Sequence, residues 1–142
     1  MITVLLADDH AMVRDGLRYL LEAAGNIQIV ALASNGKEAV AQALIHCPNV
    51  AVMDVSMPVM DGIEATRQIC ELVPQTRVVA LSMYHTPEYM QRAVQAGAFG
   101  YVLKDAAGNE LVAAVHNLYG GQHYFSPKIA VSYKDQPGKD KL

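Results

Sequence analysis

The chain has 142 residues, of which 52% are hydrophobic and 18% are charged, and its formal net charge is −3. This length suits one ordinary domain, and the composition is that of a globular protein and not of a disordered one. The negative charge argues against a surface that binds nucleic acid by charge alone, because phosphate binding needs a concentrated basic face.

The apolar stretches of the chain are all short. None reaches the ~20 residues that a membrane span needs. The N-terminus also lacks the basic start and the long apolar segment of a signal peptide. These features predict a cytoplasmic protein that does not act on or in a membrane.

Five apolar runs alternate along the chain with five segments of helical spacing. The first run, Ile2–Ala7, precedes an apolar helix face formed at steps of three and four by Val13, Leu17, Leu20, Leu21 and Ala24. The later pairs of a strand and a helix are Gln28–Ala33 with about Lys37–Ile45, Asn49–Met53 with about Ile63–Leu72, Arg77–Leu81 with the segment between Thr86 and Gly97, and Gly100–Leu103 with about Asn109–Leu118. Strands that are apolar at nearly every residue predict a parallel sheet covered on both faces. The fold class expected is therefore α/β, a doubly wound five-stranded parallel sheet with five helices.

Polar and charged residues stand where four of the five apolar runs end. Asp8 and Asp9 follow the first run, Asp54 the third, Ser82 the fourth and Lys104 the fifth. In a doubly wound sheet, ligands bind outside the carboxyl ends of the strands, where the strand order reverses. If the order is 2-1-3-4-5, the first and third strands are neighbours and the three acids meet at one edge.

Three carboxylates in one crevice repel one another unless a cation lies among them. Mg²⁺ takes few protein carboxylates and completes its coordination with water and phosphate oxygens, while a lysine and a hydroxyl bind phosphate. The pattern therefore predicts a Mg²⁺-dependent site for phosphoryl transfer. Taken singly, each residue has another explanation, since an Asp at such a junction is commonly a helix N-cap and Ser82 or Lys104 could be solvated.

The five histidines lie at His10, His46, His85, His116 and His123. They show no spacing typical of a transition-metal site. His10 stands beside the acid pair and could touch the crevice, and a surface or capping role is expected for it.

Four stretches carry most of this pattern: VLLADDH, VAVMDVSMPVMDGIEATRQI, VVALSMY and AGAFGYVLKDA. They resemble the receiver domain of two-component response regulators, over about residues 1–121. The details LSMY and YVLKDA, followed by GGQHYFSPKIA, are most similar to the NarL/LuxR subfamily. The resemblance implies a flavodoxin-like receiver fold with the strand order 2-1-3-4-5.

Carried over by position, the resemblance implies that Asp54 accepts a phosphoryl group, that Lys104 pairs with Asp54 or its phosphate, and that Ser82 binds a phosphate oxygen. Tyr101 stands where the family has its switch aromatic, and a partly buried strand tyrosine is the alternative. We expect Ser82 to move toward the phosphoryl oxygens and Tyr101 to turn inward, reshaping the face of the fourth helix, fifth strand and fifth helix. The protein would act as a switch and not as an enzyme.

The resemblance also implies a cofactor and partners. Mg²⁺ would be bound directly by Asp9, largely through water by Asp8, and further by Asp54 and the backbone carbonyl of Ser56. The phosphoryl donor would be a cognate sensor histidine kinase. A homodimer that forms on phosphorylation is a further expectation.

Residues 1–121 are expected to form the receiver domain and residues 122–142 a linker or tail, because the pattern loses its period from Tyr124 onward. Ser126 and Pro127 would begin a short helix through Val131, and the last residues have the composition of a flexible linker. In the NarL/LuxR subfamily a helix-turn-helix DNA-binding domain follows the receiver, so DNA would be contacted only through a C-terminal domain absent from these residues. A stand-alone receiver that acts through a protein partner is the alternative.

The same residues disfavour three other classes of protein. An aspartate-nucleophile phosphatase has its two acids two residues apart on the first strand, whereas Asp8 and Asp9 are adjacent. A flavodoxin-like mononucleotide domain needs a Gly- or Ser/Thr-rich phosphate loop, whereas the first turn reads DDHAMV. A degenerate receiver that only dimerises is disfavoured because every chemically required position is filled.

Overall fold

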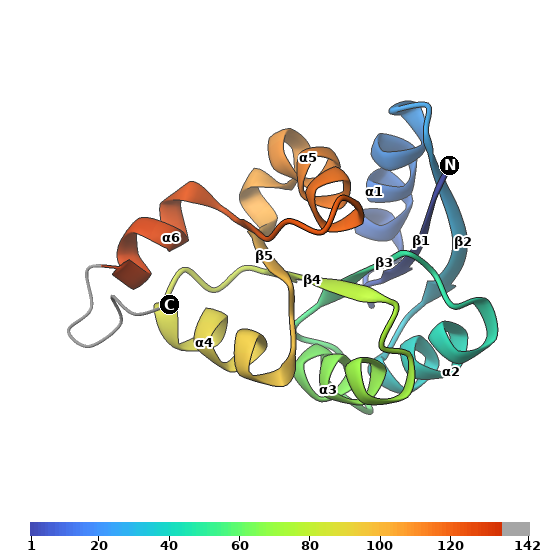
Figure 1. Cartoon of the computed structure of the whole chain (residues 1–142), viewed down its shortest axis with the longest axis horizontal. Coiled ribbons are helices and arrows are strands. Elements are labelled where there is room, and N and C mark those ends of the chain that lie inside the picture. The colour runs from blue at the N-terminus through green and yellow to red at the C-terminus, as the bar shows by residue number, and fades with distance from the viewer. Residues whose placement is uncertain (135–142) are drawn as a thin grey trace.

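The computed structural model describes residues 1–134, shown in Figure 1. The strands are β1 (Ile2–Ala7), β2 (Ile27–Ala33), β3 (Val50–Asp54), β4 (Arg77–Ser82), β5 (Gly100–Leu103) and β6 (Tyr124–Phe125). The helices are α1 (Ala11–Ala23), α2 (Gly36–His46), α3 (Gly62–Leu72), α4 (Pro87–Ala96), α5 (Ala107–Tyr119) and α6 (Pro127–Lys134), and a 3₁₀ turn, η1 (Lys104–Ala106), precedes α5. The last residues of the predicted linker, 135–142, lie outside the described part of the chain.

The strands form one parallel sheet in the order β2-β1-β3-β4-β5-β6. This confirms the α/β doubly wound class and the order 2-1-3-4-5. The expected number of elements was wrong, because the described residues form six strands and six α-helices and not five of each. The extra strand is two residues long, too short to show a period, and it is defined by pairing of Tyr124 with Gly100 and of Phe125 with Tyr101.

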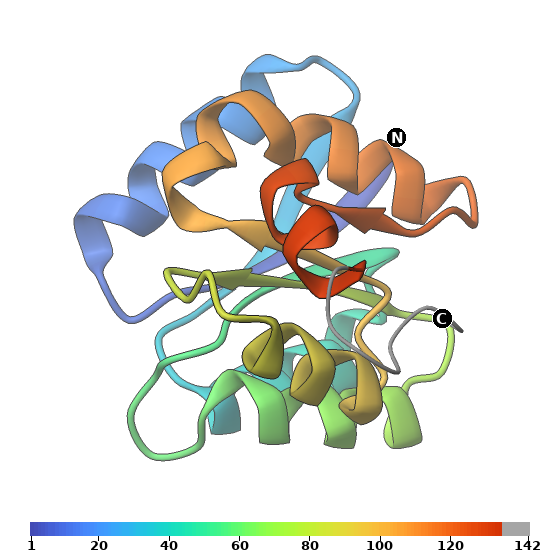
Figure 2. The ribbon, with the colours of Figure 1, turned by 90° about the vertical axis from the view of Figure 1, so that its left-hand side faces the viewer.

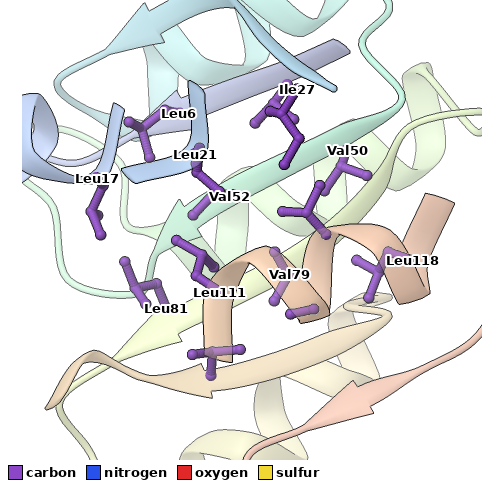
Figure 3. Packing of buried hydrophobic residues seen from close by; sticks show 14 of the residues in the cluster. Leu6, Leu17, Leu21, Ile27, Val50, Val52, Val79, Leu81, Leu111 and Leu118 are labelled. Atoms are coloured by element: carbon purple, nitrogen blue, oxygen red, sulfur yellow. The ribbon is translucent and has the colours of Figure 1, made fainter. Parts of the chain in front are cut away.

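The sheet is covered by helices on both faces. Helices α1 and α5 pack on one face, and α2, α3 and α4 pack on the other (Figures 1 and 2). Figure 3 shows the first of these interfaces, where side chains of α1 and α5 meet the sheet through buried residues that include Leu17, Leu21, Val52, Val79, Leu111 and Leu118. Burial on both faces explains why the strands are apolar at nearly every position. No helix within residues 1–134 has both the length and the apolar character needed to cross a membrane.

The strand order reverses between β1 and β3, which are neighbours in the sheet although α1, β2 and α2 separate them in the chain. In their register, Ala7 pairs with Met53, so that Asp8 and Asp54 follow at the same level. Strand β4 continues this edge, because Leu81 pairs with Asp54 and Ser82 pairs with Leu103. The carboxyl ends of four strands therefore lie side by side.

The predicted helix that begins at Ser126 and Pro127 is present as α6, and it extends to Lys134. Helix α6 packs against α4. Figure 2 shows it at the β5–β6 side of the sheet, between α5 and α4. The start of the predicted tail is thus part of the packed structure.

Candidate functional site

Three acidic side chains meet at the carboxyl end of the sheet. Asp54 is the last residue of β3, and Asp8 and Asp9 follow β1 directly. Asp8 is fully buried and Asp54 is 1% exposed, whereas 27% of the Asp9 side chain is exposed. One carboxylate oxygen from each acid and one ring nitrogen of His10 all lie within 4.8 Å of one another. The structure therefore brings together the three acids that the sequence predicted to converge.

Lys104 lies at the edge of this cluster. Its Nζ donates a 2.9 Å hydrogen bond to Asp54 Oδ2 and lies 3.2 Å from Asp8 Oδ2. Only 18% of its side chain is exposed. Because Lys104 follows β5, its ammonium joins the ends of β1, β3 and β5. One ammonium against three carboxylates leaves the cluster negatively charged.

Two buried carboxylate oxygens of the cluster, Asp8 Oδ2 and Asp9 Oδ1, have no hydrogen-bond partner among the described residues. Lys104 Nζ and His10 Nδ1 lie 3.2 Å from them, at ion-pair distance but without hydrogen-bond geometry. Buried oxygens are rarely left in this state, because the lost hydration is not replaced. Hard oxygen ligands of this kind suit a small divalent cation such as Mg²⁺.

His10 also belongs to the cluster. Its side chain is 65% exposed, as expected for a surface residue, but its Nδ1 lies 3.2 Å from Asp9 Oδ1. Its backbone N–H donates to Asp8 Oδ1 at 2.8 Å, and its side chain makes no capping hydrogen bond to α1. The only sequence signal for this contact was its position beside the acid pair.

Burial and charge act against each other at the pair of Asp54 and Lys104. Burial raises the pKa of Asp54 above its ordinary value, while the hydrogen bond and charge of Lys104 and the N–H of Ser56, 3.2 Å from Asp54 Oδ1, oppose this rise. For Lys104, burial acts to lower the pKa, but the hydrogen bond and charge of Asp54, together with Asp8, outweigh it and raise the pKa. Lys104 is therefore a constant positive charge beside a carboxylate that is costly to bury.

Ser82 and Tyr101 both bind the backbone of Tyr84, in the loop between β4 and α4. The Oγ of Ser82 accepts a 2.9 Å hydrogen bond from the Tyr84 N–H. The hydroxyl of Tyr101 donates a 2.9 Å hydrogen bond to the Tyr84 carbonyl. Tyr101 is fully buried, which raises its pKa, so its ring already lies inside the protein. The expected movements of Ser82 and Tyr101 stay predictions.

A groove of about 560 Å³ opens beside Asp9 and Ser56. One wall carries Tyr84 and Tyr89, whose rings stack with centroids 3.9 Å apart, and the guanidinium of Arg92 lies 5.5 Å from the Tyr89 ring centroid. Sequence reasoning missed this wall, because its residues come together only when the β4–α4 loop folds onto α4. Of the three clustered acids, Asp9 is the one that lines this groove.

The chain that carries these acids, the lysine and the hydroxyl is similar to known proteins. Residues 4–116 match the family model of the response regulator receiver domain. The chain belongs to this family. As a receiver domain of a two-component system it is a signalling module, which agrees with the resemblance seen in the sequence motifs.

Relatives place the receiver domain in the NarL/LuxR subfamily. It is 40% identical to the response regulator GacA of Pseudomonas protegens, over 99% of this chain and 67% of that protein. It is 38% identical to the oxygen regulatory protein NreC of Staphylococcus carnosus, over 91% of this chain and 60% of that protein. The chain thus spans about three fifths of the length of NreC. A LuxR-family two-component response regulator from Aurantimonas sp. SI85-9A1 superposes with a TM-score of 0.89 at 35% identity, covering 93% of this chain and 94% of that one.

Proposed function

We propose that this receiver domain accepts a phosphoryl group on Asp54 from a sensor histidine kinase. The observation that carries the proposal is the 2.9 Å hydrogen bond from Lys104 to Asp54, at a strand end where Asp8 and Asp9 converge. A carboxylate is a nucleophile that can form an acyl phosphate. The lysine offsets the charge that would otherwise repel an anionic phosphodonor.

In the proposed transfer, a carboxylate oxygen of Asp54 attacks the phosphorus atom of a phosphohistidine. The new P–O bond forms as the P–N bond breaks, and the electron pair of the P–N bond stays on the imidazole nitrogen. Lys104 balances the negative charge on the transferred group, which is the main catalytic need of such a reaction. The domain is the acceptor in this reaction and does not turn over, so we do not propose an enzyme.

The acids fit a bound Mg²⁺ ion, because the buried oxygens of Asp8 and Asp9 lack hydrogen-bond partners within the described chain. We propose that Asp8, Asp9 and Asp54 hold the ion, with the backbone carbonyl of Ser56 as a further ligand. When bound, Mg²⁺ would neutralise negative charge on the phosphoryl group. Phosphorylation adds about −1.5 to −2 charges and three acceptor oxygens, one of which Ser82 would bind.

We propose that the switch controls transcription through a DNA-binding domain. GacA is named a response regulator and NreC an oxygen regulatory protein, and both are longer than this chain. We propose that a C-terminal helix-turn-helix domain outside these residues binds DNA in the cytoplasm, and that phosphorylation promotes a homodimer. A stand-alone receiver that acts on a protein partner is the second candidate.

The test is a phosphorylation assay by intact-protein mass spectrometry. The chain is incubated with Mg²⁺ and acetyl phosphate, and a gain of one phosphoryl group is expected. Asp54→Asn should abolish the gain, while Asp15→Asn, which changes an exposed acid of α1, should keep it. A parent chain that gains nothing, or an Asp54→Asn variant that still gains the group, would refute the proposal. Steady hydrolysis of many phosphomonoesters would indicate a phosphatase instead.

A further inference from the structure

Ser126 anchors the segment that follows α5 to the rest of the domain. It is fully buried. Its N–H donates to the Tyr101 carbonyl at 2.9 Å, and its Oγ accepts from the Leu103 N–H at 3.0 Å. The same hydroxyl donates to Glu110 Oε1 at 2.6 Å. Ser126, which directly follows β6, therefore joins that strand to β5 and α5 inside the protein.

The same residue starts α6. Its carbonyl accepts hydrogen bonds from the N–H groups of Ile129 and Ala130, at 3.1 and 3.0 Å. Pro127 is the first residue of the helix, a position that suits a residue without an N–H. Because Ser126 is bonded to β5 on one side and to the first turn of α6 on the other, a shift of β5 reaches α6 directly.

Strand β5 is in turn tied to the phosphoacceptor site. Lys104, bonded to Asp54, follows Leu103 directly in the chain. Tyr101 donates from its hydroxyl to the backbone of Tyr84, in the loop beside the site. Tyr101 and Leu103, the two β5 residues that bond Ser126, are thus both linked to the site, Tyr101 through its own hydroxyl and Leu103 through the next residue, Lys104.

Apolar packing provides a second link between the same elements. Ile129 of α6 is 1% exposed and belongs to an apolar cluster with Tyr101 of β5 and Met90 of α4. Close-packed interiors do not deform smoothly, so a changed position of one member must be met by its neighbours. A movement of Tyr101 or of α4 would therefore alter the space that holds Ile129.

We propose that Ser126 is the junction through which a change at Asp54 repositions α6, and with it the chain that follows. This inference rests on the proposed phosphorylation of Asp54. It adds the path through which the resulting structural change would reach the C-terminal end of the domain. Ser126 is a positioning residue, because it touches no reacting atom and acts through Tyr101 and Leu103. Loss of its hydroxyl would leave the Leu103 N–H without its partner and would break the bond to Glu110. It would weaken the link between α6 and the end of β5, of which the backbone bond to Tyr101 would remain.

The first experiment measures amide hydrogen exchange of residues 124–134, with and without Mg²⁺ and acetyl phosphate. In the parent, phosphorylation should change this exchange several-fold. Ser126→Ala should gain the phosphoryl group as the parent does and lose the change in exchange. The matched control is Thr76→Val, which deletes another buried hydroxyl, bonded to the Pro48 carbonyl at 2.7 Å at the opposite end of β4 from the site. This control should keep the change.

A merely structural role of Ser126 predicts a different result. Both variants would then be less stable, and both would keep the phosphorylation-dependent change in exchange, which would overturn the proposal. If Ser126→Ala does not fold, Ile129→Ala is the second variant, since it leaves every hydrogen bond of Ser126 in place and removes the apolar packing of α6 in the cluster with Tyr101 and Met90. It should reduce the change in exchange, and an undiminished change would count against the junction.

A second experiment needs no phosphodonor. Asp54→Asn removes the carboxylate that binds Lys104, and its effect on exchange in residues 124–134 is measured with Ser126 present and with Ser126→Ala. A double-mutant cycle of this kind isolates the coupling between two sites. We expect a several-fold effect only with Ser126 present, and equal effects in both backgrounds would refute the junction. A parent that gains no phosphoryl group would refute only the proposed function. The double-mutant cycle would still test whether Ser126 couples Asp54 to α6.

Discussion

Lys104 donates a 2.9 Å hydrogen bond to Asp54, although the two residues are 50 positions apart in the chain. The bond joins the end of β5 to the end of β3, across β4. It also places a positive charge where three carboxylates would otherwise repel one another. A change in the charge of Asp54 therefore acts directly on Lys104, at the end of β5.

Replacement of this lysine should destabilise the fold without abolishing it. Lys104→Met leaves Asp54 and Asp8 buried without a compensating charge, which should lower the free energy of unfolding by about 3 kcal/mol at neutral pH without divalent cations. Urea denaturation measures the loss. The control is Arg67→Met, which removes an exposed pair with Glu64 and should cost no more than about 0.5 kcal/mol. Equal losses in the two variants would contradict the prediction.

The raised pKa of Asp54 predicts a pH dependence with a definite sign. Above its ordinary value of 3.8, the native carboxyl keeps a proton that the unfolded chain releases, so stability falls as pH rises through this window. Asp54→Asn cannot titrate. The stability of Asp54→Asn relative to the parent should therefore increase from pH 3 toward neutral pH in urea denaturation without Mg²⁺. Glu71→Gln, an exposed acid of α3, should show no such trend, and a relative stability that falls with pH would refute the assignment.

Mg²⁺ should stabilise the parent, because a cation that binds only the native state raises the free energy of unfolding. At one hundred times its dissociation constant the gain should be about 2.7 kcal/mol. Asp9→Asn should lose most of this gain, whereas Asp15→Asn on α1 should retain it. Thermal unfolding with Mg²⁺ and then with a chelator measures both. An undiminished response of Asp9→Asn would exclude that residue as a ligand.

The hydroxyl of Tyr101 should contribute to the stability of the β4–α4 loop. Tyr101→Phe keeps the buried ring and removes the hydrogen bond to the Tyr84 carbonyl, at an expected cost of about 1 kcal/mol. Tyr119→Phe serves as the control, since 51% of Tyr119 is exposed, and its effect should stay within about 0.5 kcal/mol. Chemical denaturation distinguishes the two. A neutral Tyr101→Phe would show that the loop does not depend on this bond.

Gly62 should tolerate no side chain, because it packs against the backbone of Asp54. A Cβ at this position would collide with the Asp54 carbonyl. Gly62→Ala should therefore cost about 1–3 kcal/mol and slow phosphorylation by acetyl phosphate, since the acceptor is displaced. Gly16→Ala on α1 meets open space and should stabilise by about 0.5–1 kcal/mol. A neutral Gly62→Ala would mean that the backbone of Asp54 can move freely.

Much of the fold could be predicted because its signals are local. Strands β1, β3, β4 and β5 are buried at nearly every residue, so each forms an apolar run in the sequence, and the residue after each run lies at the carboxyl edge of the sheet. That rule identified Asp8, Asp9, Asp54, Ser82 and Lys104 before any coordinates. The residue types at those positions then predicted the class of chemistry, because few sites need acids, a lysine and a hydroxyl together.

The sequence by itself thus determined the sheet and the residues that stand at its edge. Only the tertiary structure decided how they meet: the buried oxygens of Asp8 and Asp9 without partners, the aromatic wall of Tyr84 and Tyr89, and the short strand β6 held through Ser126. These features are contacts between residues far apart in the chain. A two-residue strand has no period, and a hydrogen bond between distant residues depends on the packing of everything between them.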